Sequence, residues 1–212
     1  MMSAIRFIQE GGFFMYPTLI IMLIGFGMAI ERILFFIRIK ASNKALWDEV
    51  FPAIQKGDLD KALKHVKDNE TELGRILEYG LARNKTARSV EDVETAMEEA
   101  LMEVMPRLEA RTPYLASFAN IATLIGLLGT VHGMIMAFAA VANADPAQKG
   151  DMLSASIAVA MNNTALGLGA AIPLLLASSF LQSRTAEAIE TLETATVKIL
   201  NVLRQVRGAD GH

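Results

Sequence analysis

The chain has 212 residues, of which 52% are hydrophobic and 20% are charged, and its formal net charge is −3 at pH 7. An ordinary charged share combined with a mean hydropathy of +0.34 fits neither a purely soluble domain nor a chain made only of membrane spans. The negative net charge argues against a nucleic-acid partner, and the absence of cysteine excludes disulfides and thiolate metal sites.

Two segments are predicted at the start of the chain. Residues 1–12 predict a short interfacial helix, in which Arg6 and Glu10 stand among apolar residues before a glycine pair ends the pattern. Residues 13–38 predict the first transmembrane helix, because the apolar stretch exceeds the roughly 20 residues that span a bilayer. A signal peptide is the alternative, but the basic n-region is weak, the apolar run is too long and no small-residue cleavage site precedes Glu31. We therefore expect an uncleaved span.

Charged residues at the ends of the apolar stretches set the expected orientation. Glu31 and Arg32 adjoin the end of the first span, where they either anchor the helix at the interface or pair with neighbouring subunits. Cations follow the first span, precede the second and follow the third: Arg32, Arg38, Lys40, Lys44, Arg107, Arg111 and Arg184. By the positive-inside rule these ends are cytoplasmic, which puts the N-terminus in the periplasm and the C-terminus in the cytoplasm.

Residues 39–112 predict a cytoplasmic helical domain. Asp58 is placed to cap one amphipathic helix, and Ser89 opens a capping box before another. Pro106 and Pro113 are expected to kink or end the helix that runs toward the second span. Glutamates surround the apolar stripe of this helix and are interpreted as a solvated face: Glu94, Glu98, Glu99 and Glu103.

Residues 113–142 and 153–182 predict a second and a third transmembrane helix, joined by a periplasmic link at 143–152. Both are rich in small and polar residues, which in membranes usually face protein or water. The second span holds Asn120, Thr123, Gly126, Gly129, Thr130 and Gly133. The third holds Ser156, Asn162, Asn163, Thr164, Gly167, Gly169 and Pro173.

Three- and four-residue steps give each span one polar face. In the second span the residues at these steps are Asn120, Thr123, Leu127 and Thr130, and in the third they are Ser156, Ala160, Asn163 or Thr164, Gly167 and Ala171. The pore-lining candidates are Asn120, Thr123, Thr130, Ser156, Asn163 and Thr164. The helix-packing candidates are Gly126, Gly129, Gly133, Gly167, Gly169 and Pro173. Two such faces can line one hydrated cavity, but hydroxyl and glycine residues also serve packing alone, and both interpretations stand.

Metal and catalytic sites find little support in the sequence. His65 and His212 have no other potential metal ligands at a suitable spacing, so we expect no metal site. The sequence has no nucleotide-binding or nucleophile motif, so we expect no cofactor and no enzymatic activity. His132 lies inside the second span, where an ionisable side chain is a functional candidate, or else faces a subunit or outer-interface contact. Residues 183–212 predict a cytoplasmic helix with a heptad-like seam that continues the third span and a loose tail from Gly208.

Two runs carry a resemblance to a known family. Residues 125–135, IGLLGTVHGMI, resemble the second membrane helix of the ExbB/TolQ/MotA family of proton-channel motor subunits, and residues 163–173, NTALGLGAAIP, resemble its third. With AIER at 29–32, the resemblance covers nearly the whole chain and fits the three-span ExbB/TolQ branch better than the four-span MotA branch. One departure is that relatives commonly carry a glutamate five residues before the motif threonine, where this chain has Val159.

The resemblance implies an all-α membrane protein with three transmembrane helices and a cytoplasmic helical domain, helices two and three extending into the cytoplasm. It implies a pentamer in the bacterial inner membrane, a dimeric single-span ExbD/TolR-like partner whose membrane aspartate carries the proton, and a TonB/TolA-like energy-transducing protein. Thr130 and Thr164 match the motif threonines, and Asn163 would stand in for part of the missing carboxylate's hydrogen bonding. A sodium-driven motor and a non-conducting membrane scaffold are the alternatives.

Overall fold

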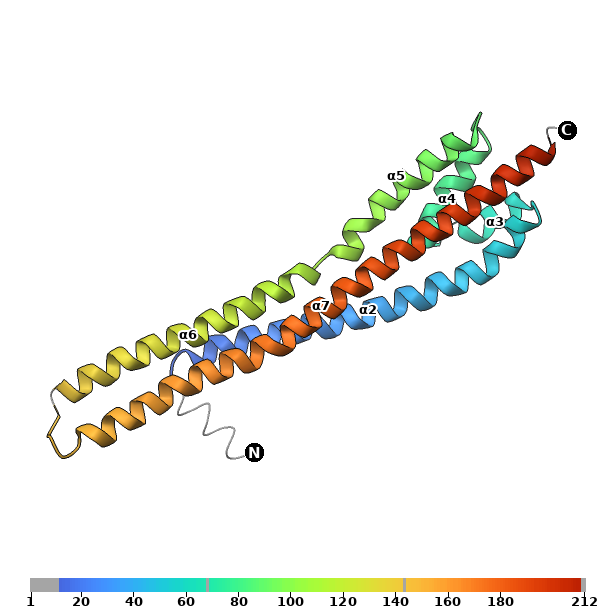
Figure 1. Ribbon diagram of the computed structural model, residues 1–212. Coiled ribbons are helices and arrows are strands. Elements are labelled where there is room, and N and C mark those ends of the chain that lie inside the picture. Colours follow the sequence, from blue (N-terminus) through green and yellow to red (C-terminus); the bar gives the residue numbers. More distant parts are fainter. Residues whose placement is uncertain (1–11, 68, 143, 211–212) are drawn as a thin grey trace. The chain divides into compact units, whose positions relative to one another are not determined.

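The computed structural model describes residues 12–67, 69–142 and 144–210, and helices make up 89% of the protein with no strand among the described residues. In chain order the helices are α2 (Met15–Gln55), α3 (Leu59–Val66), α4 (Glu72–Asn84), α5 (Val90–Glu109), α6 (Thr112–Ala142) and α7 (Lys149–Asp210) (Figure 1). The all-α prediction is confirmed. The expected interfacial helix at 1–12 lies outside the described residues except for Gly12, and His212 lies outside them too.

Among the described residues, three long helical stretches are apolar enough to cross a membrane by length and composition: Met15–Gln55, Val90–Ala142 and Lys149–Val206. Within them, large aliphatic side chains remain on the surface of the single chain. Leu23, Leu124 and Leu176 are 67%, 63% and 68% exposed. Because soluble monomers rarely expose such continuous apolar surface, these faces require lipid or other protein around them.

Contacts divide the described chain into two compact units. Residues 12–32 and 111–181 form the first, here called the hairpin unit because it contains α6 and the part of α7 that follows it. Residues 33–110 and 182–210 form the second, here called the bundle unit.

The bundle unit has its own hydrophobic core, to which α2, α3, α4, α5 and α7 all contribute. Its fully buried side chains include Ile54, Val66, Leu77, Met97 and Ile199. The seam predicted after the third span supplies the α7 part of this core, with Leu192, Ile199 and Leu203 buried. This part of α7 therefore packs on its own chain. The helix continues to Asp210, so the loose tail expected from Gly208 is wrong for residues 208–210.

Predicted caps begin two helices of the bundle unit. Asp58 accepts a hydrogen bond from the backbone N–H of Lys61 at 3.1 Å and caps α3. Ser89 and Asp92 form a capping box at α5, in which each side chain accepts from the other residue's backbone N–H at 3.3 Å. Both caps agree with the sequence pattern, since short polar side chains satisfy the free N–H groups of a first turn.

The chain leaves α5 between the two prolines. Pro106 lies inside α5 without ending it, and its carbonyl accepts from the N–H of Ala110 at 3.0 Å. Arg111 then adopts a left-handed backbone with φ of 65°, and α6 begins at Thr112. Pro113 thus stands in the first turn of a helix, where its missing N–H leaves no bond unmade. Of the two expected outcomes, a kink or an end, Pro106 does not end α5, since the helix continues to Glu109 and the break comes five residues after the proline, at Arg111.

Candidate functional site

In the hairpin unit, α6 and α7 run side by side and touch through glycines (Figure 1). A Cβ atom added to Gly167 would lie 2.8 Å from the carbonyl oxygen of Ala122 and 3.0 Å from the Cα of Gly126. A Cβ at Gly133 would lie 2.8 Å from that of Ala160. The two backbones are so close that larger residues would force them apart, as in small-residue contacts between membrane helices.

Two hydroxyl groups meet at this contact. The Oγ1 atoms of Thr130 on α6 and Thr164 on α7 lie 2.7 Å apart. Thr164 Oγ1 also lies 3.1 Å from the carbonyl oxygen of Gly126, across the helix interface. Thr130 Oγ1 lies 3.2 Å from that same oxygen and 2.9 Å from the carbonyl oxygen of Leu127. Both threonines are half-buried.

The two hydroxyls have fewer protons than contacts. Each threonine hydroxyl carries one proton and two lone pairs. The pair therefore has two protons for four short oxygen–oxygen contacts, namely the one between the hydroxyls, two to the Gly126 carbonyl and one to the Leu127 carbonyl. At any moment the two hydroxyl oxygens keep some lone pairs that can accept a hydrogen bond from another group. The arrangement can thus rearrange its hydrogen bonds without moving its oxygen atoms.

Asn163 lies next to this pair on α7 and is buried, with 5% of its surface exposed. Its Nδ2 donates to the carbonyl oxygen of Val159 at 3.2 Å. Gly129 makes room for it, since a Cβ there would lie 2.8 Å from the Cβ of Asn163. The amide side chain is therefore bonded to Val159, the residue five positions before the motif threonine.

The other polar candidates do not join the hydroxyl pair. Thr123 donates its Oγ1 hydrogen to the carbonyl of Ala119 at 3.1 Å within α6, and Asn120 is exposed. Ser156 is half-buried nearer the start of α7. Gly169 has no atom within 4 Å of an added Cβ, so it makes no close contact within this chain, and Pro173 lies inside α7.

His132 is exposed on α6 and points to an aromatic neighbour. Its ring centroid lies 5.3 Å from that of Phe14 at an interplanar angle of 60°. Among the described contacts of His132, none is with Thr130 or Thr164. Among the described residues, no three acidic, thiol or imidazole side chains gather as a metal site.

An ion pair that sequence reasoning missed joins the first span to the start of α6. Arg111 Nη1 lies 3.3 Å from Glu31 Oε1, and Arg32 beside it is only 3% exposed. The sequence predicts that Glu31 and Arg32 either anchor the helix at the interface or pair with neighbouring subunits, whereas in the structure Glu31 has a partner in its own chain. The sequence does show a cation, Arg111, before the second span. Its pairing with Glu31 could not be predicted, because it depends on a contact between two segments that are far apart in the sequence.

Comparison of the sequence with known proteins identifies a family. Residues 68–194 match the family described as MotA/TolQ/ExbB proton channel family. The chain belongs to this family. As a family member with three apolar helices, it is a multi-pass membrane protein of the inner membrane.

Individual members of the MotA/TolQ/ExbB family are recognisably similar. An ExbB homologue of biopolymer transport from Methanothermobacter thermautotrophicus is 28% identical over 193 residues, which cover 90% of this chain and 67% of that protein. The Tol-Pal system protein TolQ of Haemophilus influenzae is 42% identical over 95 residues, covering 45% of this chain and 41% of TolQ. TolQ of Pseudomonas aeruginosa is 32% identical over 122 residues, covering 57% of this chain and 52% of TolQ. The matched segments thus cover about half of the length of the TolQ proteins or less.

Proposed function

We propose that this chain is the ring-forming subunit of an inner-membrane motor driven by the proton-motive force. Several copies, a pentamer by family resemblance, would surround an ExbD/TolR-like single-span partner and convert ion flow into mechanical work on the envelope. The spans would lie at 13–38, 113–142 and 153–182, with the N-terminus periplasmic, the C-terminus cytoplasmic and the region 39–112 in the cytoplasm. A TonB/TolA-like protein would transmit the work.

The hydroxyl pair of Thr130 and Thr164 is the observation that carries this proposal. Its oxygens are 2.7 Å apart and sit in helices whose stretches at 112–142 and 152–181 contain no acidic residue. A threonine hydroxyl does not take up a proton at ordinary pH, so the pair serves as a hydrogen-bonding surface for water or for an acid that comes from outside the chain. The proton carrier is therefore the partner's membrane carboxyl group.

Asn163 also fits the proposal that this chain supplies hydrogen-bonding groups and the partner supplies the titrating carboxyl group. It is a buried amide beside Gly129, and it is bonded to the carbonyl of Val159. An amide at this place keeps hydrogen-bonding capacity next to the hydroxyl pair without adding a charge to the membrane interior. The chain lines the path, and the partner supplies the titrating group.

A sodium-driven motor is the second candidate, because the same oxygens are hard ligands. The hydroxyl oxygens of Thr130 and Thr164 and the carbonyl oxygen of Gly126 lie within 3.2 Å of one another. Hydroxyl and carbonyl oxygens are the groups that hard cations prefer. Replacing sodium by potassium in the flux assay separates the two ions.

The test is ion flux in liposomes that contain this chain and its single-span partner. Thr164→Val keeps the side-chain shape and removes the hydroxyl, and Thr123→Val is the matched control because Thr123 bonds only within α6. We expect flux to require the partner, to fall severalfold in Thr164→Val and to persist in the control. If the complex forms and Thr164→Val leaves flux unchanged, the pair serves packing and does not lie on the ion path. If no partner binds and no flux is seen, the scaffold interpretation is correct.

A further inference from the structure

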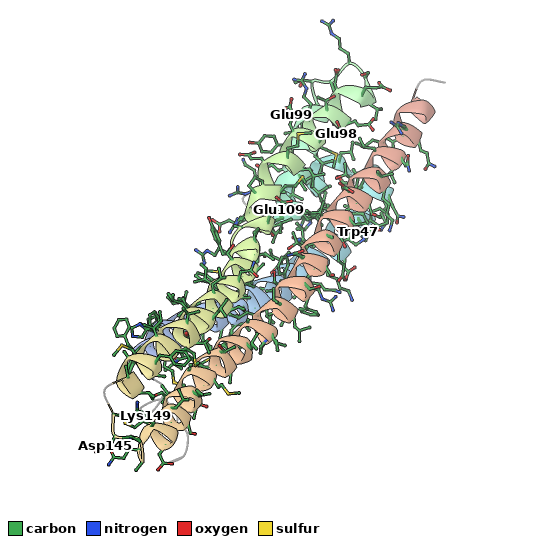
Figure 2. The ribbon with its side chains drawn as sticks, turned by 60° about the vertical axis from the view of Figure 1, so that its left-hand side comes forward. Trp47, Glu98, Glu99, Glu109, Asp145 and Lys149 are labelled. Atoms are coloured by element: carbon green, nitrogen blue, oxygen red, sulfur yellow. The ribbon has the colours of Figure 1, made fainter. Side chains whose placement is uncertain are left out.

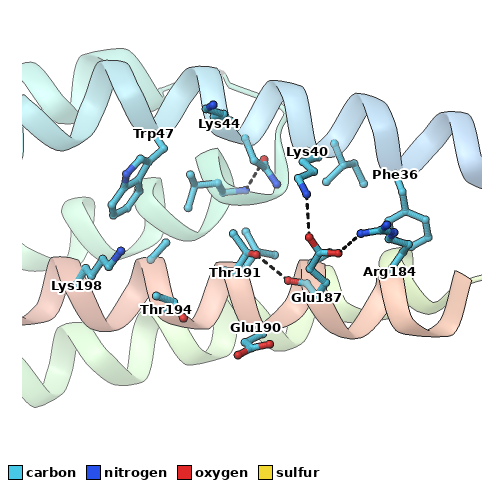
Figure 3. Close-up of a pocket in the computed structure, with 16 residues that line it drawn as sticks. Phe36, Lys40, Lys44, Trp47, Arg184, Glu187, Glu190, Thr191, Thr194 and Lys198 are labelled. Carbon is cyan, nitrogen blue, oxygen red and sulfur yellow. Dashed lines mark hydrogen bonds and ion pairs between the residues drawn. The ribbon is translucent and has the colours of Figure 1, made fainter. Parts of the chain in front are cut away.

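The bundle unit contains a pocket of about 440 Å³ between α2 and α7. Aromatic and aliphatic side chains such as Phe36 and Trp47 line it, and Figure 3 shows Lys40 and Arg184 reaching Glu187 at one end. Figure 3 also shows Trp47 at the other end, where the Lys198 ammonium lies 5.8 Å from its ring. The pocket is therefore apolar inside and charged around its rim.

The rim of this α2–α7 pocket has a surplus of positive charge. Its cations are Lys40, Lys44, Arg184 and Lys198, and its anions are Glu187 and Glu190. Glu187 is the shared partner of Lys40 and Arg184, which leaves Lys44 and Lys198 without a carboxylate partner in the described part of the bundle unit. A ligand for this pocket should have an apolar centre and negative charge around it.

The exposed face of α5 has these properties. Its opposite face, with Val93, Met97 and Val104, is buried in the core of the bundle unit. Met102 is 68% exposed, an unusual state for a long apolar side chain, and exposed glutamates surround it: Glu98, Glu99, Glu103 and Glu109. Figure 2 places three of these glutamates along α5 and Trp47 at a separate position next to α7. Since α5 turns its buried face to the core, Met102 does not reach the pocket of its own chain.

We propose that the α2–α7 pocket of one copy receives the acidic face of α5 from the next copy, with Met102 as the apolar anchor. The inference rests on the proposed function, because it assigns a contact in the proposed ring. The dimensions agree. Glu98 to Glu109 and Phe36 to Trp47 each span eleven residues of helix, or about 16 Å at 1.5 Å per residue. Methionine is flexible and fills irregular apolar pockets.

Such a contact joins two different surfaces, so it is head-to-tail and closes into a ring when its rotation allows. Glutamates against Lys44 and Lys198 would fix the register of the two copies, and desolvation of Met102 would supply the apolar burial. The same surfaces would otherwise leave an exposed methionine and two lysines with no carboxylate among the described residues of this unit.

Disulfide cross-linking tests the contact. Because the chain contains no cysteine, every disulfide between two copies must come from the introduced residues. Cells would co-express the partner with two versions of the full chain, Met102→Cys and Thr194→Cys. Thr194 lines the pocket and is exposed. The control replaces Met102→Cys by Tyr79→Cys, which is 49% exposed on α4. Oxidised membranes are analysed by non-reducing electrophoresis, and the oligomer is sized by native mass measurement.

We expect a cross-linked dimer with Met102→Cys that forms severalfold faster than with Tyr79→Cys. Adding Glu99→Lys to one version or Lys44→Glu to the other should slow it, and combining the two should restore it, which misfolding would not do. An intact oligomer with equal rates for both cysteine pairs overturns the contact and leaves the proposed function standing. A chain that stays monomeric beside its partner overturns the ring of the proposed function as well.

Discussion

Thr130 and Thr164 share the carbonyl oxygen of Gly126, at 3.2 and 3.1 Å, while their own oxygens lie 2.7 Å apart. This relationship exists because Gly126 has no side chain. A Cβ at Gly126 would lie 3.0 Å from the carbonyl oxygen of Asn163 and would separate the two helices. The polar contact and the close packing of α6 on α7 are therefore one feature of the sequence.

Gly167→Ala should weaken the hairpin unit. The new Cβ would lie 2.8 Å from the Ala122 carbonyl oxygen, a backbone atom that cannot rotate away. Overpacking of this kind costs about 1–3 kcal/mol. Thermal unfolding of the detergent-purified protein measures it, and Gly169→Ala is the control because its Cβ meets no atom within 4 Å. Equal unfolding temperatures for the two variants would contradict the close contact.

The left-handed backbone at Arg111 predicts a difference between two substitutions. Arg111→Gly and Arg111→Ala both remove the ion pair with Glu31, but only glycine adopts a φ of 65° without strain. The alanine variant should be less stable than the glycine variant by about 1 kcal/mol. Denaturation of the two variants in the same detergent compares them directly, and an alanine variant as stable as the glycine variant would argue against the turn.

Ser89→Ala should destabilise the bundle unit by about 1 kcal/mol, because it leaves the backbone N–H of Asp92 without its cap. Thr95→Ala on the same helix is the control, since Thr95 only donates to the carbonyl of Glu91 inside α5. Alanine favours helix, so the control should be neutral or slightly stabilising. Hydrogen exchange of the α5 amides reports the difference.

Glu187 predicts a pH dependence of the bundle unit. The hydrogen bond from Lys40, then that from Arg184, holds the pKa of Glu187 below its ordinary value. A carboxyl group with a lowered folded-state pKa stabilises the folded state above its ordinary pKa, and this stabilisation is lost as the pH falls through the lowered value. The effect is small, because the pair is solvent-exposed.

Thermal unfolding across the acid range tests this titration. Glu187→Gln should flatten part of the pH dependence, whereas Glu190→Gln, an exposed neighbour on α7, should not. Parallel pH curves for the wild type and Glu187→Gln would rule out a contribution from this group.

Local signals predicted most of the fold. Apolar length predicted the long helices, and short polar side chains before amphipathic runs predicted the caps at Asp58 and Ser89. These inferences succeed because each depends on a few adjacent residues.

Contacts between segments that are far apart in the sequence could not be predicted from the sequence. The partner of Glu31 is eighty residues away at Arg111, and the helix boundary at Ala110 depends on a backbone angle of Arg111 that no proline imposes. The proline rule points to Pro106, yet α5 continues past Pro106 to Glu109. Tertiary contacts outweigh local preference at such places.

The surplus of contacts over protons at Thr130 and Thr164 has a consequence for speed. Reorienting a hydroxyl is a side-chain rotation on the picosecond to nanosecond scale, whereas helix movements take microseconds or longer. The local dipole at this crossing can therefore follow an approaching charge almost at once, while the heavy-atom framework of α6 and α7 stays still. In the proposed motor, a rigid framework with a fast electrical response would suit a surface past which the partner's charged group travels.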